Sequence, residues 1–205
     1  MTRRLNYARR KSRGGKKLIP PNPLQWENEH NGLDLREDLG IPLDVPLDHD
    51  LAFEQMLPMV AVHPHGSIPA ADKYLNHFRL SGSSAWSGMA ITLPDGFELV
   101  FYNDSHPINR IRSTLMEEFY HIWLEHPKSL VRIYSEDRKW RTFNSKIEEE
   151  AYGSGAAALV PYRPMCEMLA SGLSTTAIAR HFRVSTDLVL FRGKVTKTYR
   201  RMRRP

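Results

Sequence analysis

The chain has 205 residues, of which 41% are hydrophobic, and this suits one domain with its own core and at most a small appendage. Cys166 is the single cysteine, so an internal disulfide is excluded and a reducing compartment is the simplest setting. Apolar runs fall well short of the roughly 18 residues that span a bilayer. The sequence therefore predicts a cytoplasmic protein that makes no use of a membrane.

Positive charge is concentrated at the two ends. Residues 1–17 contain eight Lys or Arg and no acid, and residues 194–205 contain six, so the intervening residues carry −8 against a net charge of +6. Clustered basic residues bind phosphates by releasing counterions, which favours non-specific contact with nucleic acid, although two solvated tails are the alternative. The candidate contacts are Arg200, Arg201, Arg203 and Arg204.

Composition divides the chain into three parts. Residues 1–30 are expected to form a basic arm and a linker, because three prolines between Leu18 and Trp26 favour extended backbone. The arm lacks the apolar segment of a secretory signal. We expect the main domain over residues 31–165 and a C-terminal helical segment with a basic tail over residues 166–205.

The main domain is expected to begin with a helix over residues 48–59 and a short strand over residues 60–62. The strand stops at His63-Pro-His-Gly66, for which a surface turn is favoured over a metal site. A hairpin follows, because β-branched and aromatic residues in 89–93 and 97–102 flank an Asp-Gly turn.

A helix from about residue 108 to residue 125 carries two stripes of different chemistry. The apolar stripe that packs on a core consists of Ile111, Leu115, Phe119 and Ile122. The neighbouring stripe presents Glu117 and His121, which a four-residue spacing places on one face, with Glu118 beside them. Two ligands at this spacing, with a Glu directly after the first, are typical of a metallopeptidase centre with one ligand altered.

A second helix opens with Glu148 and two further glutamates and continues with a run of Gly and Ala. Small residues let such a helix approach its neighbour closely, as is needed to bring Glu148 near His121. The helix dipole alone also favours acid at this end, and on its own the motif helix would present an ordinary solvated face. Together the two segments predict a metal centre. The predicted ligands are Glu117, His121 and Glu148, and the predicted general base is Glu118.

The sequence Glu117-Glu-x-x-His121, followed by Glu148-x-x-Ala151 and an Ala-rich segment ending in Leu-Val-Pro161, resembles the ImmA/IrrE family of metallopeptidases. The usual family pattern is His-Glu-x-x-His and then Glu-x-x-Ala-Asn/Asp. The likeness covers about residues 40–192. It implies an α+β, zincin-like metallopeptidase domain with a small β-sheet, a motif helix and a C-terminal helix-turn-helix-like cluster, and it implies Zn²⁺ as the cofactor.

Two positions depart from the family pattern. Glu117 replaces the first His, and Tyr152 replaces the Asn or Asp that follows Ala151. Two carboxylates and one neutral His leave a zinc site formally neutral, so its Lewis acidity should fall and Mn²⁺ or Mg²⁺ should compete better. Without a metal, the carboxylates would favour protonated His121 and make a structural ion cluster. The residues leave both outcomes open.

Residues 174–182 and 185–192 have the pattern of a helix, a short turn and a second helix, with Ser174 and Ser185 as N-caps. The second helix of such a pair can enter a DNA groove. Asp187, near the start of this second helix, would be repelled by DNA phosphates. A role of the helix pair in packing the domain is therefore favoured over a role in reading DNA bases.

The resemblance implies a metal-dependent endopeptidase that acts as a cytoplasmic regulator and cleaves or inactivates a DNA-binding repressor. The alternative is a catalytically impaired pseudo-peptidase that serves as a protein- or nucleic-acid-binding module. A third reading is a helix-turn-helix DNA reader, whose binding would survive loss of the whole metal centre.

Overall fold

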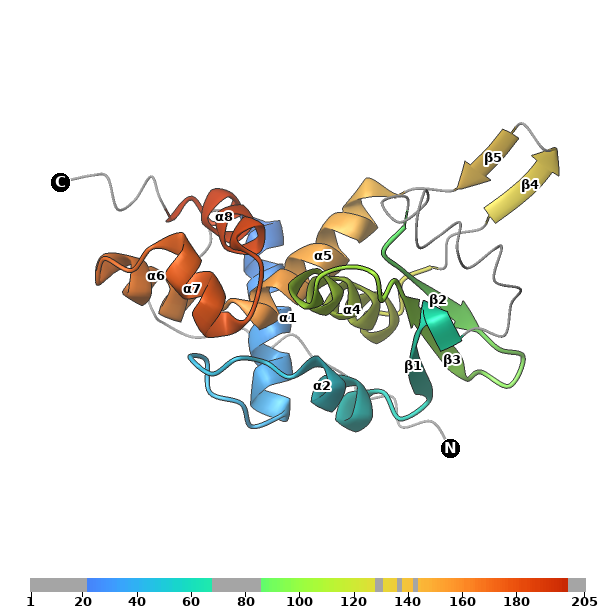
Figure 1. Ribbon diagram of the computed structural model, residues 1–205, viewed down its shortest axis with the longest axis horizontal. Helices are drawn as coiled ribbons and strands as arrows, with labels where there is room; N and C mark the ends of the chain where they lie inside the picture. The colour runs from blue at the N-terminus through green and yellow to red at the C-terminus, as the bar shows by residue number, and fades with distance from the viewer. Residues whose placement is uncertain (1–21, 68–85, 128–130, 136–137, 142–143, 199–205) are drawn as a thin grey trace.

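A computed structural model describes residues 22–67, 86–127, 131–135, 138–141 and 144–198. In chain order the elements are α1 (Pro23–Asp38), α2 (His49–Met56), β1 (Val60–Pro64), η1 (His65–Ser67), β2 (Gly88–Thr92), β3 (Glu98–Tyr102), α4 (Ile108–Trp123), β4 (Val131–Ser135), β5 (Arg138–Arg141), α5 (Ser145–Leu159), α6 (Tyr162–Ala170), α7 (Thr175–Phe182) and α8 (Thr186–Val195) (Figure 1). The predicted α+β class is confirmed.

Two charge-rich segments fall outside this description. The basic arm at residues 1–17 and the arginines between positions 200 and 204 lie beyond the described residues, so their contact with nucleic acid stays a prediction. Among the residues that are described, no helix is both long enough and apolar enough to cross a membrane.

The three-stranded sheet has the order β1-β3-β2, with β1 parallel and β2 antiparallel to the central β3. The predicted hairpin is therefore confirmed. At its turn the Asp95 carboxylate accepts from the Phe97 amide at 3.0 Å, and Gly96 adopts φ +84°, a conformation that glycine reaches without strain. Strand β2 lies at an edge of this sheet and contacts α4, so it places its backbone beside the motif helix.

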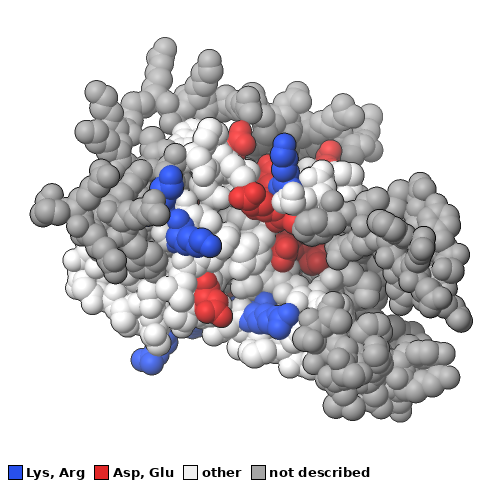
Figure 2. Space-filling model, turned by 90° about the horizontal axis from the view of Figure 1, so that it is seen from above, with Lys and Arg blue, Asp and Glu red and all other residues white. Residues whose placement is uncertain are grey.

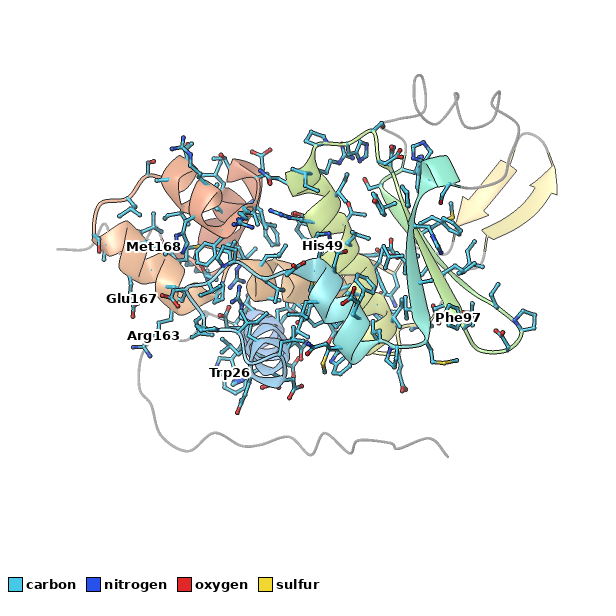
Figure 3. The ribbon with its side chains drawn as sticks, turned by 60° about the horizontal axis from the view of Figure 1, so that its bottom comes forward. Trp26, His49, Phe97, Arg163, Glu167 and Met168 are labelled. Atoms are coloured by element: carbon cyan, nitrogen blue, oxygen red, sulfur yellow. The ribbon has the colours of Figure 1, made fainter. Side chains whose placement is uncertain are left out.

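The predicted apolar stripe of α4 is confirmed. Ile111, Leu115 and Phe119 are buried, and Ile122 packs against the same core. The ring of Phe119 meets that of Phe53 in α2 edge to face, with centroids 5.4 Å apart. Figure 3 shows α2 lying beside α4, with His49 at its start.

Glycines allow α5 to pack closely between α1 and α4 (Figure 1). A Cβ added at Gly155 would lie 3.0 Å from the carbonyl carbon of Met116 in α4. One added at Gly32 of α1 would lie 2.6 Å from the amide nitrogen of Ala158, closer than side chains tolerate. The expectation that small residues bring the second helix against the motif helix is confirmed.

The linker expected up to residue 30 is wrong for residues 22–30, because α1 begins at Pro23. The Asn22 side chain caps it by accepting from the Gln25 amide at 2.8 Å, and proline is suited to the first turn of a helix. The helix escaped prediction because the face that it buries is largely polar. Its buried polar side chains are Gln25, Asn28, Glu29 and Arg36.

Helices α6, α7 and α8 form a cluster at the end of the molecule away from the sheet (Figure 1). The predicted caps are confirmed: Ser174 accepts from the Ala177 amide and Ser185 from the Leu188 amide, both at 3.1 Å. The boundary predicted between residues 165 and 166 falls inside α6. On this helix Arg163 and Glu167 form an exposed pair at 2.9 Å (Figure 3).

A buried ion pair attaches the C-terminal cluster to α1. The Arg192 guanidinium in α8 is fully buried and donates to the Glu29 carboxylate. The same carboxylate accepts from the Tyr162 amide at 2.7 Å, and Arg192 also donates to the Val160 carbonyl at 3.0 Å. Helix α8 therefore packs into the domain through a charged side chain as well as through Leu188 and Val189.

Candidate metal centre

Helices α4 and α5 bring the three predicted ligands together. Glu117 and His121 lie one turn apart on α4, and Glu148 lies in the first turn of α5. One donor atom from each residue lies within 4.8 Å of the others, and His121 Nε2 is 3.4 Å from Glu148 Oε2. The His121 and Glu148 side chains are 18% and 21% exposed, so the cluster is shielded but reachable from solvent.

The spacing of this cluster fits a small divalent cation. Donors held tetrahedrally at about 2.0–2.1 Å from zinc are themselves about 3.4 Å apart, which is the His121–Glu148 separation. At the same separation, a protonated His121 would form a direct ion pair with Glu148. One imidazole with two carboxylates suits Zn²⁺ and, because oxygen donors predominate, also Mn²⁺.

Glu118, the predicted general base, lies next to the edge strand. A Cβ added at Gly88, the first residue of β2, would lie 3.1 Å from Glu118 Oε1 and 2.7 Å from Thr114 Cγ2. Gly88 therefore makes room for the Glu118 carboxylate between α4 and the sheet. Sequence reasoning missed this role, and its one signal was a glycine directly before the predicted strand.

The second departure from the family pattern, Tyr152, lies near the first. Its ring packs edge to face on Phe191 of α8, with centroids 4.9 Å apart. Burial raises the pKa of the Tyr152 hydroxyl, and the negative charges of Glu117 and Asp187 raise it further. Tyr152 is therefore a neutral phenol that lies within the electrostatic reach of Glu117.

Two residues that the sequence did not single out extend the contacts of His121. His126, which follows the end of α4, has its Nδ1 atom 3.1 Å from Nδ1 of His121. The Nε2 atom of His126 lies 3.3 Å from Oε2 of Glu150, in the first part of α5. Glu148 and Glu150 thus approach the two histidines from the same helix.

A second group with metal-ligand chemistry, at the start of α2, has another explanation. Donor atoms of Asp48, His49 and Asp50 also lie within 4.8 Å of one another. Asp48 already caps α2 by accepting from the Asp50 amide at 3.1 Å, and both carboxylates are largely exposed. Burial lowers the pKa of His49, and the nearby Arg112 also lowers it, although Asp50 and Asp48 oppose this. Asp48 therefore has a role as the helix cap that needs no metal.

The surface turn expected at His63-Pro-His-Gly66 is wrong for His65. This side chain is 1% exposed, and its Nδ1 lies 2.6 Å from Oδ1 of Asp104. Its ring meets that of Trp86 edge to face at 5.6 Å. Pro and Gly imply a turn, but here β1 extends to Pro64 and the turn is covered by the segment after β3.

Acidic side chains gather near the middle of the face shown in Figure 2, with Lys and Arg side chains around them. Grouped carboxylates attract cations locally, and the basic side chains around them weaken this attraction.

The α+β fold is that of a zincin-like metallopeptidase domain. The Peptidase_M78 family model, described as IrrE N-terminal-like domain, matches residues 69–194, which is more than half of the chain. The chain therefore belongs to this metallopeptidase family, and the resemblance to ImmA/IrrE proteins is confirmed. A search of curated proteins finds no match.

Proposed function

We propose that the protein is a metal-dependent endopeptidase that acts in the cytoplasm and cleaves or inactivates a DNA-binding repressor. One observation carries the proposal: donor atoms of Glu117, His121 and Glu148, from two helices, lie within 4.8 Å of one another. Glu118 is the residue after Glu117 in α4. These three residues would hold one divalent ion, Zn²⁺ or Mn²⁺. When bound, the ion would act as a Lewis acid toward the peptide bond and the attacking water.

Glu118 has the role of general base. It takes a proton from the attacking water and passes it to the leaving amine, a function that requires an ionised carboxylate within hydrogen-bonding reach. The absence of a side chain at Gly88 keeps space for this carboxylate beside the edge strand. The chain thus has a candidate base on the sheet side of α4 and candidate ligands on the α5 side.

Glu117 tunes the proposed site. With two carboxylates and one neutral imidazole a divalent ion is formally neutralised, whereas two imidazoles and one carboxylate leave it at +1. The proposed centre is therefore a weaker electrophile than the usual family site and accepts harder ions more readily. We expect correspondingly modest activity.

The proposed substrate, a DNA-binding repressor, follows from the family resemblance. The packing of α8 supports a structural role for this helix over DNA reading, because Leu188, Val189 and Arg192 are buried in the domain. Its exposed positions include Asp187 and Lys194, which present opposite charges. Such a surface gives little attraction to phosphate.

A second candidate function is a pseudo-peptidase that binds a protein or nucleic acid without cleaving it. The 3.4 Å contact between His121 and Glu148 favours this reading, because the two side chains already form an ion pair when His121 is protonated. In that case the cluster joins α4 to α5 and performs no chemistry.

Co-expression with candidate repressors separates the two functions. The variants are Glu118→Gln and, as a matched control, Glu149→Gln, which makes the same chemical change on the exposed side of α5. If the protein is an endopeptidase, the wild type and Glu149→Gln both cut the repressor, while the cleavage rate of Glu118→Gln is lower by about 10²-fold or more. Equal cutting by all three proteins would refute the role of Glu118. An uncut repressor that co-purifies with all three supports the pseudo-peptidase.

A further inference from the structure

The end of α4 turns the chain back onto the candidate metal centre. The Glu125 amide donates to the Ile122 carbonyl at 3.0 Å, and the His126 amide donates to the His121 carbonyl at 2.9 Å. Glu125, the residue before His126, has φ +54°, in the left-handed region. These features define a Schellman helix end, in which the residue after the left-handed one commonly makes an apolar contact one turn back. Here that contact pairs His126 with His121.

The two imidazoles are held in a defined arrangement. Their planes meet at 71° with centroids 5.1 Å apart, and their Nδ1 atoms are 3.1 Å apart. The His126 side chain is 8% exposed, whereas that of Glu150 is 36% exposed. A continuous series of hydrogen-bonding atoms therefore leads from the candidate ligand His121, through a buried imidazole, to a carboxylate at the surface.

The positions of the protons follow from this geometry. Two facing Nδ1 atoms form a hydrogen bond only when one of them carries a proton and the other does not. His121 directs Nε2 toward Glu148, so as a neutral ligand it carries its proton on Nδ1 and donates it to His126. A neutral His126 that accepts through Nδ1 carries its own proton on Nε2, and this atom faces Glu150.

We propose that His126 and Glu150 are positioning residues that fix the tautomer and the ring orientation of His121 for metal binding. This inference rests on the proposed function, because it requires His121 to be a ligand. Histidine ligands commonly donate their second ring N–H to a carboxylate or carbonyl, and loss of that partner weakens metal binding roughly 10- to 100-fold. In this protein an imidazole stands between the ligand and the carboxylate.

Two substitutions at His126 separate hydrogen bonding from helix capping. His126→Leu provides the apolar contact usual at a Schellman end but no acceptor for His121. His126→Asn places an amide oxygen near the position of Nδ1 and keeps an acceptor. In Zn²⁺ titrations of the full chain we expect His126→Leu to bind roughly 10- to 100-fold more weakly than wild type and His126→Asn to recover most of the loss. Glu149→Gln is the control and should bind as wild type does.

Nitrogen-15 NMR of the zinc-loaded wild type provides a readout that needs neither catalysis nor a variant. We expect His121 protonated on Nδ1 and His126 protonated on Nε2. His126 protonated on Nδ1, or His126→Leu binding zinc as tightly as wild type, would overturn the positioning role while the proposed metal site stands. A wild type that binds neither Zn²⁺ nor Mn²⁺ would overturn both proposals. If thermal unfolding shows that His126→Leu does not fold, the positioning role is tested by zinc binding to His126→Asn and by the tautomers that NMR finds in the wild type.

Discussion

Gly88→Ala tests the packing of β2 against the motif helix. The added Cβ would lie 2.7 Å from Thr114 Cγ2, against about 3.5–4.0 Å for an ordinary carbon contact. Thr114 is buried in α4, so relief on the order of 1 Å must come from displacement of the strand or the helix. Overpacking of this kind costs about 1–3 kcal/mol, and the lower unfolded-state entropy of alanine offsets about 0.4–1 kcal/mol. We expect a net destabilisation of about 1–2 kcal/mol.

Urea unfolding of a double-mutant cycle measures this clash. Thr114→Ser removes the methyl group that the new Cβ meets, so Gly88→Ala should cost less in that background, with a coupling energy of about 0.5 kcal/mol or more. The Cβ would also lie 3.1 Å from Glu118 Oε1, so cleavage should fall on the order of 10²-fold even where the chain folds. A Gly88→Ala chain as stable as wild type, or a coupling energy of zero, would refute the packing argument.

Three further predictions concern stability. Arg192→Met should lower the free energy of unfolding by about 3–5 kcal/mol because it leaves the Glu29 carboxylate buried without its partner, and adding Glu29→Gln should restore part of the loss in urea unfolding. Because the pKa of Tyr152 is raised, the folded chain keeps the phenol proton at a pH where the unfolded chain loses it. The free energy of unfolding should therefore fall as pH rises above about 10, and it should fall less steeply in Tyr152→Phe. Equal pH dependence in the two proteins would contradict the raised pKa. Glu125 has left-handed backbone, which is costly for a residue with a side chain and above all for a β-branched one. Glu125→Gly should therefore be at least as stable as the wild type, and Glu125→Val should be less stable by about 1–2 kcal/mol. A valine variant more stable than the glycine variant would contradict the Schellman assignment.

Local periodicity and capping made much of the fold predictable. The four-residue spacing of Glu117 and His121 placed both on one face of α4, and the apolar stripe next to this face packs on the core. The run of small residues implied a close approach of α5, which the contact at Gly155 confirms. These signals lie within single segments of sequence, where spacing alone determines which side chains share a face.

The remaining features depend on long-range contacts that no local pattern reveals. Helix α1 buries polar side chains whose partners lie over a hundred residues away, such as Glu29 with Arg192, so its inward face resembles a solvated one. His65 is buried by the segment after β3, although its local sequence predicts a turn. His126 approaches His121 because Glu125, a residue with no intrinsic preference for the left-handed region, adopts it.

Metal titration of Glu117→His tests the central claim most directly. The proposed centre has the ligand atoms of Glu117, His121 and Glu148 within 4.8 Å of one another, so an imidazole at position 117 should complete a two-histidine site. Calorimetric titration should show at most one divalent ion per chain in the wild type, with Zn²⁺ bound more tightly by Glu117→His and Mn²⁺ favoured less. If Glu117→His binds no more zinc than the wild type, these three side chains do not form a metal centre.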